Sequence, residues 1–99
     1  MKWHMVITDN ANFRCVIHII QKLKQSKGDS VSVFLTGRGV LVINDEEFHS
    51  LIKELDRCVV CEFSLEKYGV KEDLPSGVDV GGQFQNAELV STSDTTVCL

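Results

Sequence analysis

The residues best suited to chemistry in this chain are two cysteines, Cys58 and Cys61, in the stretch RCVVCEFSLEKYGV that spans residues 57 to 70. A Cys-x-x-Cys pair can bind metal, or act as a redox pair when its first cysteine begins a helix. Here Val59 and Val60 separate the thiols, and adjacent β-branched residues favour a strand. Because residues three apart in a strand point to opposite faces, we predict that these thiols share neither a disulfide nor a metal ion.

A zinc site is poorly supported by the other candidate ligands. Structural zinc takes about four ligands, usually as two close pairs of cysteines or as a cysteine pair with a histidine pair. The remaining candidates are dispersed singly, at Cys15, Cys98, His4, His18 and His49. Cys15 and Cys98 are expected to be small buried hydrophobic residues, and His18 and His49 partly exposed surface histidines. We therefore expect no metal ion and no cofactor.

Cys61 differs from the other cysteines in its expected place in the fold. If its strand ends near Phe63 and a helical turn begins at Ser64, Cys61 lies close to the carboxyl end of a strand. Parallel α/β sheets place ligands and reactive groups beyond this edge. The exposed peptide N–H groups of a following helix would also lower the thiol pKa. The alternative interpretation is a buried core cysteine in an apolar strand.

The other short motifs do not identify a reaction. Gly37, Arg38 and Gly39 form a GRG that is too short for a phosphate-binding fingerprint, which needs further glycines or a Gly-Lys-Ser/Thr ending. We interpret it as a turn, and we take its three residues together with Ser64 as a possible pocket. The serines have no histidine and acid at a recognisable spacing, so a serine hydrolase is not indicated.

Strand-like and helix-like segments alternate along the chain. Strands are predicted at residues 3 to 8, 30 to 36, 58 to 63 and 95 to 99, with the run at 30 to 36 in the centre of the sheet. Helices are predicted at about 10 to 27, 45 to 56 and 83 to 93, with a short helical turn at 64 to 69 and a loop at 70 to 82. The run VLVI at 40 to 43 could be strand or helix. This alternation predicts one α/β domain with a mostly parallel sheet and helices on both faces.

The two main helices carry clear apolar faces. The face of the first comprises Phe13, Val16, Ile17, Ile20 and Leu23, and that of the second Phe48, Leu51, Ile52 and Leu55. Asn44 and Glu47 resemble a capping box at the start of the second helix. A second row of Ala11, Cys15 and Ile19 makes the first helix wider on its apolar side than one sheet contact requires. A subunit contact is one explanation of this row, which reports an interface and does not fix the number of subunits.

Length and charge exclude several classes of protein. At 99 residues the chain is long enough for one domain with its own core. A formal charge of -4 and scattered lysines and arginines argue against a nucleic-acid binder. The apolar start is broken by His4 and stopped by Asp9, and no run approaches a membrane span, so we expect neither a signal peptide nor a membrane segment. A cytoplasmic protein with reduced thiols is the default expectation.

The chain from Asp56 onward resembles the carboxyl half of the DsrE/TusD type of sulfur-relay protein, part of the wider DsrE/DsrF-like family. The matching features are a strand ending in Cys61, a helical turn closing in Gly69 and Val70, a loop, a helix like QNAELVSTSD and an apolar last strand. The run VSVFLTGRGV resembles the second strand of the family and its following Gly-Val. The sequence departs from the pattern at Glu62 and Phe63, where relay members often have small residues.

The resemblance implies a flavodoxin-like, three-layer α/β protein of the cytoplasm, assembled as a trimer, hexamer or hetero-hexamer. It also implies that Cys61 carries sulfane sulfur as a persulfide, received from one thiol carrier protein and passed to another. The alternative is a non-catalytic oligomeric binding or scaffold protein on the same fold. In that case Cys61 is structural, and the segment from Gly37 to Gly39 binds a small ligand or a partner.

Overall fold

Five strands and five helical segments follow one another along the chain in the computed structural model, which describes residues 1–70 and 73–99. In chain order they are β1 (Lys2–Ile7), α1 (Phe13–Gln25), β2 (Ser30–Leu35), the 3-10 helix η1 (Gly37–Asn44), α2 (Glu46–Ile52), β3 (Arg57–Cys61), α3 (Glu62–Lys67), β4 (Val78–Gly81), α4 (Gln83–Thr92) and β5 (Thr95–Cys98). No helix within the described residues is both long and apolar enough to cross a membrane.

The described strands form one parallel sheet in the order β4-β3-β2-β1-β5. β2 is the central strand, as its dense run of β-branched and aromatic residues predicted. The register pairs Leu35 of β2 with Ile7 of β1 on one side and with Val60 of β3 on the other. The carboxyl ends of these three strands therefore lie together at one edge, and the predicted α/β class is confirmed.

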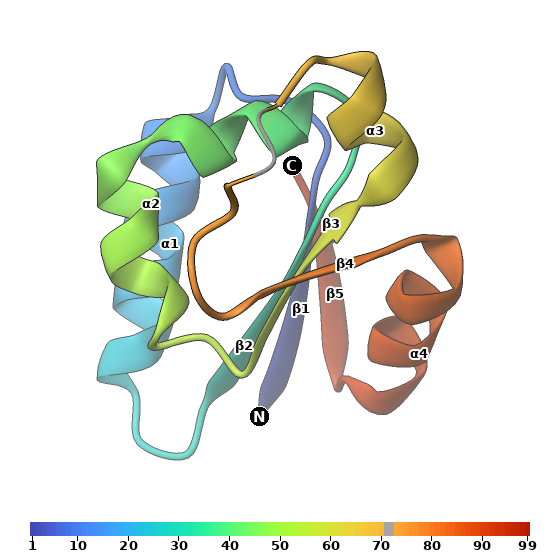
Figure 1. Ribbon diagram of the computed structural model, residues 1–99. Helices are drawn as coiled ribbons and strands as arrows, with labels where there is room; N and C mark the ends of the chain where they lie inside the picture. Colours follow the sequence, from blue (N-terminus) through green and yellow to red (C-terminus); the bar gives the residue numbers. More distant parts are fainter. Residues whose placement is uncertain (71–72) are drawn as a thin grey trace.

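The two faces of the sheet are covered unequally. α1 and α2 lie together on one face, and α4 lies on the other (Figure 1). The core under α1 and α2 includes Met5, Ile7, Val16, Ile20, Val33, Leu35, Phe48, Leu51, Cys58 and Val60. The core under α4 is smaller and holds Val6, Phe34, Val59, Cys61 and Leu89. Burial of apolar surface therefore stabilises the α1 and α2 face most.

Helix α1 packs on the sheet through its predicted face, but its second apolar row needs correction. The buried residues of α1 are Val16, Ile17 and Ile20. Ala11 precedes the helix, Cys15 is exposed, and Ile19 is partly buried against the same core as the main face. These three residues therefore form no continuous apolar strip on the helix surface, and the trimer or hexamer stays a prediction.

Two other predictions about the elements are corrected by the structure, and one open assignment is resolved. The N-cap of α2 is Asp45 instead of Asn44: its Oδ1 accepts a hydrogen bond from the Glu47 N–H at 2.9 Å. The segment 70 to 82, predicted as a loop, contains β4, which pairs with β3 along its whole length; residues 71 and 72 of that predicted loop lie outside the described residues. The run VLVI belongs to η1, so its open assignment resolves as helical.

A buried histidine joins α4 to the sheet. His4 is fully buried, its Nδ1 lies 2.8 Å from Ser32 Oγ in β2, and its Nε2 lies 2.7 Å from Asn86 Oδ1 in α4. A neutral ring satisfies both contacts when Nε2–H donates to Asn86 and the Ser32 hydroxyl donates to Nδ1. This network fixes α4 in position over β1 and β2.

The close approach of η1 to β1 requires glycine at position 39. A Cβ at Gly39 would lie 2.0 Å from the Ile7 carbonyl oxygen and 2.7 Å from the Ile7 carbonyl carbon. Both atoms belong to the backbone of β1, next to the centre of the sheet, and neither can move without disturbing the strand. The second glycine of the GRG motif therefore has a packing role.

We expect Gly39→Ala to lower the free energy of unfolding by about 3 kcal/mol or more, because the added methyl group would overlap the β1 backbone. Urea denaturation measures this change. Gly82→Ala is the matched control, since a Cβ there meets no atom within 4 Å and the φ of -152° suits any residue. The control should lose less than about 1 kcal/mol. Equal losses in the two variants would contradict the packing of η1 on β1.

Candidate functional site

Cys61 lies at the carboxyl edge of the sheet, as predicted from the sequence. It is the last residue of β3, it pairs with Gly81 of β4, and it occupies the N-cap position of α3. The predicted boundary was two residues late, since β3 does not reach Phe63 and α3 begins at Glu62 instead of Ser64. Cys61 is therefore closer to the helix start than the sequence indicated.

Cys58 and Cys61 project to opposite faces of the sheet. Cys58 belongs to the core under α1 and α2, whereas Cys61 belongs to the core under α4. The prediction that they point to opposite faces is confirmed, and both are free thiols in this structure. Burial raises the pKa of Cys58 to about 12, with a further contribution from the negative charge of Asp79. Cys58 therefore keeps its proton over the whole physiological range.

Ser64 connects Cys61 to the turn that follows β2. Ser64 is buried, and its Oγ accepts a hydrogen bond from the Gly37 N–H at 2.8 Å. Gly37 has a φ of +56°, a left-handed conformation that glycine adopts without strain. The hydroxyl proton of Ser64 is therefore directed elsewhere, and the sulfur of Cys61, three residues earlier, is placed to accept it. The structure thus brings together three of the residues singled out from the sequence.

The surroundings of Cys61 act on its pKa in opposite directions. Burial raises the pKa, but hydrogen bonds from the Ser64 hydroxyl and N–H, the Thr36 hydroxyl and the Phe63 N–H lower it by more, so that the pKa lies below the ordinary thiol value. The donors therefore favour the thiolate over the thiol, which is the condition for a reactive cysteine.

Thr36 is the site residue that sequence reasoning missed. It follows β2 directly, and since Leu35 pairs with Val60, Thr36 comes beside Cys61 when the register is continued by one residue. Its backbone is extended, with a φ of -139°. Only the pairing of β2 with β3 indicates that Thr36 lies beside Cys61, and the sequence of either strand alone does not show this pairing.

Arg38 and Gly39 have other roles than lining a pocket beside Cys61. The Arg38 side chain is 60% exposed and its Nε lies 3.9 Å from Asp9 Oδ1, a surface ion pair that contributes little. Gly39 packs against the backbone of β1. Of the four predicted pocket residues, Gly37 and Ser64 lie at the thiol site, and the glycines are explained by a turn and by close packing.

The remaining cysteines and histidines are not at this site. Cys15 and Cys98 are exposed, so the prediction that both are buried is wrong. Cys15 lies on the outer side of α1, and Cys98 lies in the edge strand β5. His18 and His49 are exposed, as predicted. Among residues 1–70 and 73–99, no three His, Cys, Asp or Glu side chains gather where they could hold a metal ion.

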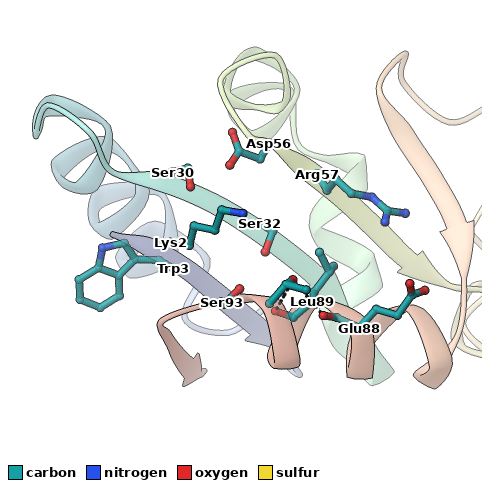
Figure 2. A pocket seen from close by; sticks show the side chains of 10 residues that line it. Lys2, Trp3, Ser30, Ser32, Asp56, Arg57, Glu88, Leu89 and Ser93 are labelled. Carbon is teal, nitrogen blue, oxygen red and sulfur yellow. Dashed lines mark hydrogen bonds between the residues drawn. The ribbon is translucent and has the colours of Figure 1, made fainter.

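A cavity of about 330 Å³ lies at the amino ends of the strands on the α4 face, and Cys61 is not among the residues that line it (Figure 2). It is lined by Lys2, Trp3, Ser30, Ser32, Asp56, Arg57, Glu88, Leu89, Thr92 and Ser93. Its charged residues are of both signs and are all exposed. The charges that line this cavity therefore favour neither an anionic nor a cationic ligand.

Comparison with solved structures identifies the fold. The chain matches the crystal structure of the ychN protein from E. coli with a TM-score of 0.75 at 14% sequence identity, covering 100% of both chains. It matches MTH1491, a protein of unknown function from Methanobacterium thermoautotrophicum, with a TM-score of 0.75 at 19% identity, covering 99% of this chain and 96% of the other. No protein-family model and no curated protein matches the sequence. These likenesses support a DsrE-like fold.

The raised pKa of Cys58 predicts a loss of stability in alkali. Above the ordinary thiol value of 9.0, the unfolded chain ionises at Cys58 while the folded protein does not until about pH 12. The free energy of unfolding should therefore fall by about 1.4 kcal/mol for each pH unit in this window. The lowered pKa of Cys61 adds no such loss, because its stabilising contribution is present in alkali and disappears only as the pH falls through that lowered pKa.

Cys58→Ala should remove this alkaline slope, as measured by urea denaturation between about pH 9 and about pH 11 in the presence of a reductant. Cys15→Ala, which changes an exposed thiol, is the control and should keep the wild-type slope. Equal slopes for wild type and Cys58→Ala would show that Cys58 is not the buried neutral thiol described above.

Because the Ser64 hydroxyl lowers the pKa of Cys61, its removal should make the thiol less reactive. In a background of Cys15→Ser and Cys98→Ser, we expect Ser64→Ala to slow the alkylation of Cys61 by iodoacetamide about tenfold at mildly acidic pH, because a hydrogen bond to a charged group contributes about 1.5–3 kcal/mol. The midpoint of the pH–rate profile should move upward. Ser50→Ala is the control, since Ser50 Oγ donates to the Glu47 carbonyl, and Ser50 is exposed on α2. An unchanged profile in Ser64→Ala would refute the role of this hydroxyl.

Proposed function

We propose that this protein is a sulfur carrier that holds sulfane sulfur as a persulfide on Cys61. The observation that carries the proposal is the set of donors from Ser64, Thr36 and Phe63 that lowers the pKa of a cysteine at the carboxyl edge of a parallel sheet. Thiolates are the nucleophiles in sulfur exchange. The DsrE-like fold is compatible with this role.

The loading step needs no cofactor. The Cys61 thiolate attacks the terminal sulfur of a polysulfide or of a donor persulfide, and a new S–S bond forms on Cys61. The bond between that sulfur and its former neighbour breaks, and its electron pair leaves with the donor as a thiolate or a shortened polysulfide. The hydroxyls of Ser64 and Thr36 stabilise the anionic sulfur before the transfer and again when the sulfur leaves.

The proposal includes partners and a compartment. A thiol protein serves as donor or acceptor, and the carrier assembles with copies of itself or with related subunits as a trimer or hexamer. The cytoplasm suits this chemistry because it keeps thiols reduced, and all four cysteines of the chain are free.

A structural role for Cys61 is the second candidate, and the burial of the side chain favours it. Cys61 is 8% exposed and packs with Val6, Phe34, Val59 and Leu89. In this alternative the protein is a non-catalytic scaffold or binding protein on the same fold. The two candidates differ in whether native Cys61 reacts with a sulfur donor.

Incubation with inorganic polysulfide should add one sulfur atom to Cys61, detected by intact-protein and peptide mass spectrometry. The experiment uses Cys15→Ser with Cys98→Ser, because those exposed thiols would load independently of the site. In this background Cys61→Ser should abolish the adduct, whereas Cys58→Ser should retain it, since the pKa of Cys58 is raised to about 12. Resistance of native Cys61 to both polysulfide and alkylation would establish the structural role instead.

A further inference from the structure

Helix α4 lies over the face of the sheet to which the Cys61 side chain points. Leu89 of α4 and Cys61 belong to the same buried cluster. In the first turn of α4, Gln85 lies against Gly81, because a Cβ on that glycine would be 2.9 Å from Gln85 Oε1. Gly81 is the β4 partner of Cys61, and paired residues of neighbouring strands project to the same face. The first turn of α4 therefore lies on the same face as the thiol, one strand away.

Few apolar side chains attach α4 to the sheet. Within α4 (Gln83–Thr92), all of whose residues are described, Leu89 is the one buried side chain. Phe84 and Val90, its other large apolar residues, are 73% and 41% exposed. By contrast, α1 and α2 each bury three apolar side chains. Because buried apolar area supplies much of the free energy that holds a helix on a sheet, α4 is held more weakly than α1 or α2.

The second half of α4 stands over a cavity instead of a packed core. Glu88 and Thr92 of the helix are among the residues that line the cavity of about 330 Å³ (Figure 2). Ser30 and Ser32 of β2 also line it, and their small side chains leave room that larger apolar residues would fill. An unfilled space gives the helix no dispersion contacts there. This half of α4 thus adds little to its attachment.

A single side-chain hydrogen bond joins α4 to a strand in the part of the chain that the structure describes. It links His4 Nε2 in β1 to Asn86 Oδ1 in α4 at 2.7 Å. His4 is fully buried, and Ser32 Oγ occupies its other ring nitrogen at 2.8 Å. The bond to Asn86 therefore satisfies a ring nitrogen that α4 itself shields from water. Its loss would favour any state in which α4 has moved away and water reaches His4.

The two ends of α4 are fixed to different degrees. After the helix, the Asp94 N–H donates to the Lys2 carbonyl at 2.8 Å, and Asp94 Oδ2 accepts from the Lys2 N–H at 2.6 Å. These bonds hold the end of the segment on β1. Before the helix come Gly81 and Gly82, and two successive glycines let the backbone turn at low cost. The end of α4 that can leave the sheet is thus the one beside Cys61.

We propose that α4 is a gate over Cys61. In the open state its first half moves off the sheet while the rest of the fold stays intact, and in the closed state the bond between His4 and Asn86 holds it in place. As regulation of sulfur transfer this inference rests on the proposed function, since a donor or acceptor sulfur reaches the covered thiol of Cys61 only in the open state. The closed state protects the thiolate from unrelated reagents.

The gate is tested by alkylation with iodoacetamide in the Cys15→Ser, Cys98→Ser background, with the rate at each thiol followed by peptide mass spectrometry. Cys58 is an internal reference, because it lies on the same strand but in the core under α1 and α2, and it reacts only when the whole domain unfolds. Urea should raise the Cys61 rate with less than about half the slope that it gives the Cys58 rate. Equal slopes would overturn the gate, since only global unfolding would then expose Cys61.

Two variants on α4 test what holds the gate closed. Asn86→Ala should raise the Cys61 rate about fivefold, because it removes the hydrogen bond to His4 in the closed state alone. Ser91→Ala is the matched control: Ser91 is exposed, and its Oγ donates to the Glu88 carbonyl within the helix. The control should stay within about twofold of the parent rate. Equal Cys61 rates in Asn86→Ala and the parent would show that this bond does not govern access.

A change on the opposite face separates the gate from global stability. Ile20 is fully buried in α1, so Ile20→Val should weaken the core under that helix. The Cys58 rate should rise about fivefold, whereas the Cys61 rate should stay within about twofold of the parent. A parallel rise at both thiols would contradict a separate opening of α4.

The same measurements distinguish the gate from the sulfur-carrier function, because iodoacetamide reports access to Cys61 whether or not the cysteine carries sulfur. Faster alkylation of Asn86→Ala without any adduct from polysulfide would support the gate, and only the proposed function would fail. Conversely, Cys61 may load with sulfur at equal rates in Asn86→Ala and the parent, with equal iodoacetamide rates as well. In that outcome the function stands and the gate is wrong.

Discussion

The surroundings of Cys61 depend on one hydrogen bond, from the Gly37 N–H to Ser64 Oγ at 2.8 Å. It joins the segments that follow β2 and β3, two neighbouring strands of the sheet. Because the serine oxygen accepts from Gly37, its own proton points away from that turn, and the Ser64 hydroxyl is one of the groups that lower the pKa of Cys61. The bond requires the left-handed φ of Gly37 and the short helix α3, so the turn and the helix are both parts of the thiol site.

Two cysteines on the same strand show which physical effect decides their chemistry. Cys58 is 1% exposed and Cys61 is 8% exposed, and burial opposes ionisation in both. At Cys58 nothing offsets burial, and the negative charge of Asp79 adds to it, so the pKa rises to about 12. At Cys61 the donors outweigh burial and the pKa falls. The carboxyl end of the strand supplies those donors, because backbone and hydroxyl groups beyond it are not used in the sheet.

Patterns with a short repeat were sufficient to predict much of this fold and the opposite directions of Cys58 and Cys61, because side chains alternate along a strand. They were insufficient where a residue depends on the element beside it. Cys15 and Cys98 are apolar in type, yet one lies on the uncovered side of α1 and the other in an edge strand. β4 is four residues long and was hidden in a segment rich in glycine, since pairing with β3 defines it more than composition does.

The thiol site itself illustrates the same limit. Cys61 could be placed at the carboxyl edge from the order of elements, and Ser64 could be placed one helical turn later. Thr36 could not, because its approach to Cys61 follows from the pairing of Leu35 with Val60. The same reasoning separates ionisation from exposure in this chain: the two exposed thiols have open access to solvent, whereas Cys61 has the convergent donors. Ionisation and access at Cys61 are therefore set by different parts of the structure, because the donors at the carboxyl edge favour the thiolate while the packing under α4 covers the sulfur.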